Sequence, residues 1–144
     1  MSREYPANPV PAVGTIVISD EHVLLVRRRN PPHAGEWSIP GGKQELAEGI
    51  CEAARREVEE ETSLTVRDLC LFDVGDIIEH DDEGRVAYHY TLIYFLARTA
   101  GGRAVAADDA SAVRWVTLAE AERIDLSPTL LQLLKRAFTS LSDE

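Results

Sequence analysis

The sequence predicts an α/β protein in which a mixed β-sheet is packed between helices. Short runs rich in Val, Ile, Leu and aromatic residues recur along the chain and are separated by turns rich in Gly, Pro and Asp. Two longer segments show helical spacing of their apolar residues, one in the middle of the chain and one at its end. Helices that flank a sheet are a stable solution for this order of elements.

The first half of the chain predicts strands followed by a helix. β-rich composition marks the strands, Asp20-Glu21 marks a hairpin turn, and prolines and glycines mark the loops. The predicted elements are an extended lead-in over 1–11, strands at 13–19 and 23–28, a loop at 30–35, a short strand at 37–39 that ends at Pro40-Gly41-Gly42, and a helix at 48–62.

The second half predicts three more strands and a closing helix. Strands at 69–78 and 86–98 flank an acidic turn at 81–84, and Gly101-Gly102 forms another turn before a strand at 113–116. Ser127 followed by Pro128 is typical of a helix N-cap with proline at the first helical position, so a helix is expected to about Leu141.

The composition limits the class of protein. With 144 residues, 44% hydrophobic and 28% charged, the chain is typical of one globular domain, expected over residues 1–144. A net charge of −10 argues against a nucleic-acid polymer as partner, because such binding depends on basic contacts to phosphates. A small phosphorylated substrate is still compatible with an acidic site, because metal ions can bridge the two.

The sequence also favours a cytoplasmic protein with no membrane partner. No run approaches the roughly 18 apolar residues needed to cross a bilayer. The N-terminus carries Glu4 and lacks the apolar centre of a secretory signal. Cys51 and Cys70 have no metal-ligand spacing, so we expect them to be small buried residues in a reducing compartment.

The helix predicted at 48–62 carries three carboxylates that structure alone does not explain. At about 100° per residue, Glu57, Glu60 and Glu61 border the apolar stripe instead of lying on the opposite face. They repel one another near the negative end of the helix dipole, and Mg²⁺ would remove that conflict. Glu-rich helices are also common as solvated faces, so the helix alone leaves both interpretations open. The stripe consists of Ala47, Ile50, Ala54 and Val58.

The spacing around this helix resembles the Nudix box, G-x5-E-x7-R-E-U-x-E-E-x-G-U. The match runs from Gly42 to Leu64, and six glycine or charged positions agree. Two positions depart from the pattern: Ser63 stands where the box has glycine, and Ala47 stands where many members have glycine. Because a left-handed residue is usual at a helix C-terminus, we expect an altered cap at Ser63 and not a lost site. The matching positions are Gly42, Glu48, Arg56, Glu57, Glu60 and Glu61.

The resemblance implies a Nudix-type α/β/α sandwich and metal-assisted hydrolysis. It implies that Glu57, Glu60 and Glu61 bind Mg²⁺, with Mn²⁺ as an alternative, and that the carbonyl of Gly41 or Gly42 completes the shell. Arg56 would orient Glu57 or Glu60, and Glu48 would support the site. Water made more acidic by the metal would attack one phosphorus in line.

The general base has two candidate locations. In this family it is a box glutamate or an acidic residue on a loop near the last strand, and Asp108 and Asp109 precede that strand here. Each of these aspartates, taken singly, also fits a solvated turn.

The substrate implied is a small nucleotide, with ADP-ribose or another nucleoside-diphosphate sugar as first choice. The strand from Val86 is similar to one in small bacterial members described as ADP-ribose pyrophosphatase-like. Arg27 and Arg28 are candidate phosphate ligands, and Trp37 and Tyr90 candidate platforms for a purine, although arginines at strand ends are more often surface charges and aromatics more often pack in cores.

Three other interpretations compete with this one. The site could cleave an ordinary or oxidised nucleoside triphosphate, or a dinucleoside polyphosphate. A Nudix-fold module that binds a nucleotide without cleaving it is an alternative of a different class, but such modules usually lose box glutamates, and this chain retains them all. Because Nudix proteins of this size are often dimers, a homodimer is a further expectation.

Overall fold

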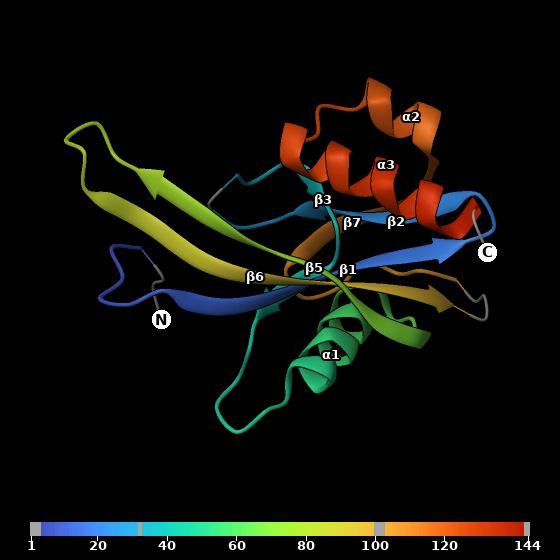
Figure 1. Cartoon of the computed structure of the whole chain (residues 1–144), viewed down its shortest axis with the longest axis horizontal. Helices are drawn as coiled ribbons and strands as arrows, with labels where there is room; N and C mark the ends of the chain where they lie inside the picture. The colour runs from blue at the N-terminus through green and yellow to red at the C-terminus, as the bar shows by residue number, and fades with distance from the viewer. Residues whose placement is uncertain (1–3, 32, 100–102, 143–144) are drawn as a thin grey trace.

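The computed structural model describes residues 4–31, 33–99 and 103–142. A mixed sheet lies between α1 on one face and α2 and α3 on the other (Figure 1), which confirms the predicted sandwich. The elements are β1 (Val10–Ser19), β2 (His22–Arg28), β3 (Trp37–Ser38), β4 (Gly41–Lys43), α1 (Ile50–Thr62), β5 (Val66–His80), β6 (Val86–Thr99), β7 (Ala110–Thr117), α2 (Leu118–Arg123) and α3 (Pro128–Ser142).

The sheet is organised around β1. Its strand order is β3-β2-β1-β6-β5, with β4 also paired to β1 and β7 to β2. β1 runs parallel to β6, whereas the other strand pairs among the described residues are antiparallel. β1 is buried from Ala12 to Ile18, as expected for a strand covered on both faces.

Alternate residues of β1 face the two helical layers. Val13 packs with Ala53, Ala54 and Phe95 in a small cluster under α1. Ile16 belongs to a larger cluster that includes the apolar face of α3. The period of two along a strand therefore divides the core into an α1 side and an α3 side.

Both predicted hairpins are confirmed, and the second is longer than predicted. Ser19 pairs with His22 across the first turn, where Asp20 adopts φ 53°. β5 and β6 pair over nearly their whole length and form an arm that projects from the sheet (Figure 1). The ends of β5 carry charged residues with weak strand propensity, so pairing with β6 decides their conformation.

The prediction that the helix begins at Glu48 was wrong by two residues, because α1 begins at Ile50. Ala47 adopts φ 66°, which a right-handed helix does not allow, so it is not part of the apolar stripe. Ser63 also adopts φ 66° and caps α1 in the left-handed conformation, which confirms the expectation for that position. Both departures from the box pattern thus take the backbone conformation that glycine would favour.

Two elements were missed by the sequence analysis. The short strand β3 ends before Pro40 as predicted, but Gly41 and Gly42 then belong to a further strand, β4, whose residues pair with β1. The start of α2 has a recognisable sequence signal, because Thr117 and Glu120 form a capping box with reciprocal hydrogen bonds of 3.1 Å. Ser127 caps α3 as predicted and accepts a bond from the Leu130 N–H.

The expectation that the cysteines are buried was also wrong, because Cys51 and Cys70 are both exposed. Cys51 lies on the solvent face of α1 and Cys70 on the edge strand β5. Residues 1–3 of the lead-in, Pro32 of the predicted loop and the predicted Gly101-Gly102 turn lie outside the described residues. Of the described helices, none is long and apolar enough to span a membrane.

Candidate functional site

α1 presents its carboxylates at two levels of burial. Glu57 is 8% exposed and Glu61 is 5% exposed, whereas the side chain of Glu60 is 44% exposed. Val58 lies between them in the core and is fully buried. The predicted position of Glu57 and Glu61 beside the apolar stripe is therefore confirmed, and Glu60 lies at its solvent edge.

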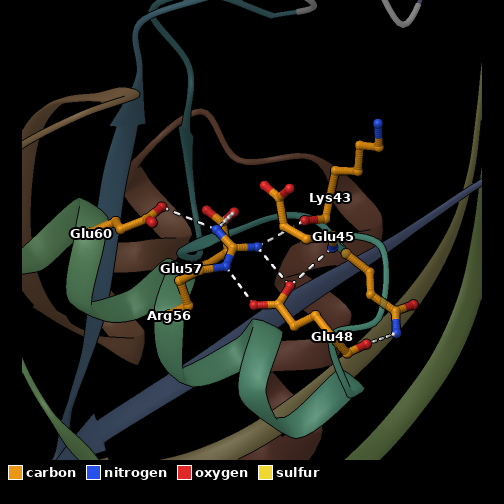
Figure 2. Close-up of polar contacts among 7 residues, drawn as sticks. Lys43, Glu45, Glu48, Arg56, Glu57 and Glu60 are labelled. Carbon is orange, nitrogen blue, oxygen red and sulfur yellow. Dashed lines mark hydrogen bonds and ion pairs between the residues drawn. The ribbon is translucent and has the colours of Figure 1, made fainter.

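Arg56 connects four parts of the site. Its guanidinium binds both carboxylate oxygens of Glu48, at 2.6 and 3.0 Å. It also donates to Glu57 at 2.8 Å, to Glu60 at 3.1 Å and to the carbonyl of Lys43 at 3.1 Å (Figure 2). A planar fork of donors suits this arrangement, because it holds several oxygens in fixed directions.

Glu48 supports the loop that precedes α1. It accepts the Glu45 N–H at 3.0 Å (Figure 2). Its own carbonyl accepts a hydrogen bond from the Gln44 side chain at 2.6 Å. Burial of Arg56 against Glu48 therefore ties the loop after β4 to the middle of α1. This contact gives Glu48 a supporting position beside the carboxylates.

β4 approaches α1 closely enough to bind one carboxylate. The Gly41 N–H donates to Glu61 Oε2 at 2.8 Å. A Cβ at Gly42 would lie 2.6 Å from the Glu57 carboxylate, so only glycine leaves room for that side chain. The Gly-Gly pair thus allows backbone and carboxylates to approach each other directly.

Burial changes the protonation of the two inner carboxylates. Loss of hydration raises the pKa of Glu57 to about 7, although Arg56 opposes the shift. Loss of hydration also raises the pKa of Glu61 to about 8, opposed by the Gly41 N–H. Two buried carboxylates with raised pKa values are typical of a catalytic or ligand-binding site.

Asp109 belongs to the same electrostatic environment. Its charge contributes to the raised pKa of both Glu57 and Glu61. Its Oδ1 accepts the Asn30 side-chain amide at 2.9 Å, and its carbonyl accepts the Arg29 N–H at 2.9 Å. Asp108 is exposed at φ 55°, in a turn.

The candidate substrate residues do not form one group. The positive charge of Arg28 opposes the rise in the pKa of Glu61, so Arg28 acts electrostatically on this site. Arg27 is exposed and donates to the Gly35 carbonyl at 3.1 Å. Trp37 packs against the core on the α3 side, and Tyr90 stacks on Tyr88 with ring centroids 6.4 Å apart.

Tyr90 faces away from α1. It pairs with Val10 and alternates with Leu92 and Tyr94, which contact the α3-side core. By the period of two in a strand, Tyr90 shares that face. The structure therefore does not bring Tyr90 next to the carboxylates of α1.

The donor set of α1 fits a hard divalent cation. Within the described residues, no three His, Cys, Asp or Glu side chains lie close enough together, as they stand, to hold a metal ion. Arg56 and the Gly41 N–H instead occupy oxygens of Glu57, Glu60 and Glu61. These carboxylates are oxygen ligands of the kind Mg²⁺ prefers, and burial of two of them favours a neutralising charge.

Sequence reasoning missed two contributors to the site. Asn30 binds the Asp109 carboxylate across 79 residues of sequence. The carbonyl of Lys43 accepts from Arg56. A pattern of residue types contains no signal for a backbone carbonyl, and Asn30 sat in a segment that looked like an ordinary turn.

Comparison with known proteins decides the family. The family model for the NUDIX domain matches residues 8–137. This chain belongs to the Nudix hydrolase family. A protein of Methanocaldococcus jannaschii named ADP-ribose pyrophosphatase is 35% identical over 120 residues, covering 83% of this hydrolase but only 64% of the relative. A Mycobacterium tuberculosis protein, named as a candidate 8-oxo-dGTP diphosphatase, is 35% identical over 122 residues, covering 84% and 82%.

Solved structures of Nudix proteins share the fold. The MutT NUDIX hydrolase of Burkholderia pseudomallei superposes with a TM-score of 0.74 at 26% identity, over 89% of this hydrolase and 97% of that chain. The NUDIX domain of NrtR from Shewanella oneidensis, solved with ADP-ribose, gives a TM-score of 0.77 at 23% identity, over 93% and 89%. At that identity the second likeness concerns the fold alone.

The raised pKa values predict that Mg²⁺ stabilises this hydrolase more at alkaline pH. A carboxyl group whose pKa is higher in the folded state contributes stability that is fully present below its ordinary pKa of 4.5. This contribution is lost as the pH rises through about 7 for Glu57 and through about 8 for Glu61. Without metal, Tm should therefore fall between about pH 6 and pH 8.5, and excess Mg²⁺ should recover roughly 3 °C or more at the upper end.

Thermal unfolding with EDTA or with Mg²⁺ at both pH values measures this effect. His33, whose pKa is raised by its bond to Glu79, shifts stability in the same direction but equally with and without metal. Glu61→Gln should flatten the metal-free pH dependence. An equal rise in Tm on addition of Mg²⁺ at both pH values would contradict the prediction.

Proposed function

We propose that this Nudix hydrolase cleaves the diphosphate bond of ADP-ribose or a related nucleoside-diphosphate sugar in a Mg²⁺-dependent reaction. The observation that carries the proposal is the set of α1 carboxylates, two buried and one at the edge, held around Arg56 and β4. The products from ADP-ribose would be AMP and ribose 5-phosphate, with one water consumed.

Glu57, Glu60 and Glu61, with the carbonyl of Gly41, would hold the metal. When bound, Mg²⁺ or Mn²⁺ supplies Lewis acidity toward the phosphoryl oxygens and neutralises charge that develops in the transition state. Arg56 keeps Glu57 and Glu60 in fixed directions, and the Gly41 N–H does so for Glu61. Fixed ligands cost no reorganisation when the reaction occurs.

Asp109 is our choice for the general base, in preference to Asp108. It would accept the proton of the attacking water as the water oxygen bonds to phosphorus and the other phosphate leaves with its bridging oxygen. This choice is supported by electrostatics, because the charge of Asp109 contributes to the raised pKa of both Glu57 and Glu61. Asp108 lies in the same exposed turn, but neither raised pKa is traced to its charge.

The choice of ADP-ribose rests on two similarities. The M. jannaschii relative carries that activity in its name. The strand from Val86 is similar to one in ADP-ribose pyrophosphatase-like members. Arg28, whose charge acts on Glu61, is the candidate ligand for the diphosphate, and the proposal gives Tyr90 no part in the reaction. We expect a small nucleotide as the only substrate class, in the cytoplasm, with a homodimer as the proposed assembly.

The test is a substrate panel with Mg²⁺. It contains ADP-ribose, other nucleoside-diphosphate sugars, nucleoside triphosphates, 8-oxo-dGTP, diadenosine polyphosphates and NADH, with products resolved by ion-exchange chromatography. AMP and ribose 5-phosphate at the highest kcat/KM would support the proposal. Diphosphate released from 8-oxo-dGTP would favour the second candidate, which the mycobacterial relative supports at the same identity. Tight binding without turnover would favour a non-catalytic module.

Asp109→Asn separates the two loop aspartates. We expect it to lower kcat by roughly 10²-fold, because a lost general base typically costs at least that much. Asp108→Asn serves as the matched control and should stay within about twofold of the wild type. Steady-state kinetics on the best substrate measures both. If neither variant changed kcat, the general base would have to be one of the box glutamates.

A further inference from the structure

The loop after β2 binds the candidate base Asp109 and the residue after it through three hydrogen bonds. Two of them hold the backbone: the Arg29 N–H donates to the Asp109 carbonyl at 2.9 Å, and the Arg29 guanidinium donates to the Ala110 carbonyl at 3.2 Å. The third holds only a side chain, since Asn30 Nδ2 donates to Asp109 Oδ1 at 2.9 Å. The backbone contacts of this loop thus come from Arg29, and its contact with the carboxylate comes from the neighbouring Asn30.

A bulge in the sheet brings these segments together. The pairing of β2 with β7 shifts register between Arg27 and Arg28, which are opposite Ala112 and Ala110. Bulges redirect the chain, and they are frequent next to active sites. Just before Asp109, the Ala107 N–H donates to the Glu61 carbonyl at 3.1 Å, so this segment lies against the end of α1.

Without the bond from Asn30, the Asp109 side chain would be free to rotate into solvent. Asp109 is exposed and water is available on its outer side. The bond from Asn30 opposes that rotation.

We propose that Asn30 is a positioning residue that holds the Asp109 carboxylate toward the carboxylates of α1, an inference that rests on the proposed function of Asp109 as general base. An amide suits this role because it donates a hydrogen bond without adding a charge. A lysine or arginine would form an ion pair with Asp109 and weaken it as a base. Asn30 itself does not touch the reacting atoms.

The experiment compares three substitutions by kcat, KM and Tm on the best substrate of the panel. Asn30→Ala should lower kcat about 5- to 20-fold and leave KM within about twofold, because the base is present but misplaced. Asn30→Asp keeps the shape but replaces the donor by a repelling oxygen, so it should lower kcat at least as much. Asn8→Ala, in the exposed N-terminal segment, is the matched control and should match the wild type.

A double-mutant cycle decides whether Asn30 acts through Asp109. In the Asp109→Asn background, Asn30→Ala should change kcat by less than about twofold, because its target is already gone. Independent, multiplicative effects would overturn the inference. Wild-type kcat in the Asn30→Asp variant would also overturn it. The same holds for an Asn30→Ala variant in which KM changes by as large a factor as kcat and Tm falls as well.

Failure of the proposed function gives different results. If no substrate is turned over, or if Asp109→Asn is silent, the assignment of Asp109 fails and the inference about Asn30 fails with it. If Asp109→Asn lowers kcat as expected and Asn30→Ala behaves like Asn8→Ala, only the inference fails.

Discussion

Glu57→Gln is expected to lower kcat by at least about 10³-fold in this hydrolase, because removing a proposed metal ligand forfeits several kcal/mol of transition-state stabilisation. Glu61→Gln should have an effect of similar size. The amide of glutamine keeps one oxygen, so Arg56 and the Gly41 N–H each retain an acceptor in the respective variant. The change therefore removes charge with little change of shape.

The stability of these variants distinguishes lost chemistry from lost folding. Because burial raises the pKa of Glu57 and of Glu61, a neutral side chain should not lower the metal-free Tm at neutral pH. The stabilisation by Mg²⁺ should disappear or fall strongly. Glu59→Gln, on the exposed face of α1, is the matched control and should retain wild-type kcat. Unchanged Mg²⁺-dependent turnover in both Glu57→Gln and Glu61→Gln would mean that the site is wrongly assigned.

Gly42→Ala is expected to lower kcat by roughly 10²-fold while the protein remains folded. The added Cβ would lie 2.6 Å from the Glu57 carboxylate, closer than such atoms can approach. That carboxylate is the end of a flexible side chain, so it would move away from Arg56 instead of forcing the backbone apart. Steady-state kinetics and thermal unfolding together measure the expected split between activity and stability.

Gly41→Ala is the informative neighbour of this variant. Its Cβ would lie 2.3 Å from the Val13 carbonyl oxygen, and neither β4 nor β1 can yield without loss of pairing. Overpacking of this kind typically costs about 1–3 kcal/mol or more, so Tm should fall by roughly 5–10 °C. Wild-type kcat in Gly42→Ala, or a stable Gly41→Ala, would contradict the account of how β4 meets α1.

The sequence by itself determined the fold class, the box and the inner carboxylates of the site. Helical periodicity placed Glu57 and Glu61 beside the apolar stripe, and their spacing from Gly42 indicated the family. These features are local in sequence, because a helix brings residues three and four apart onto one face. Ser127 and Pro128 marked the start of α3 for the same reason.

Only the tertiary structure decided which distant residues join that site. Pairing with β1 turned a Gly-Gly segment that looked like a strand end into β4, and the bulge between β2 and β7 brought Asn30 to Asp109. The tertiary structure also placed Tyr90 on the face of the sheet opposite α1 and left Cys51 exposed. Such contacts depend on register and on strand order, which short-range patterns do not contain, because pairing partners lie tens of residues apart.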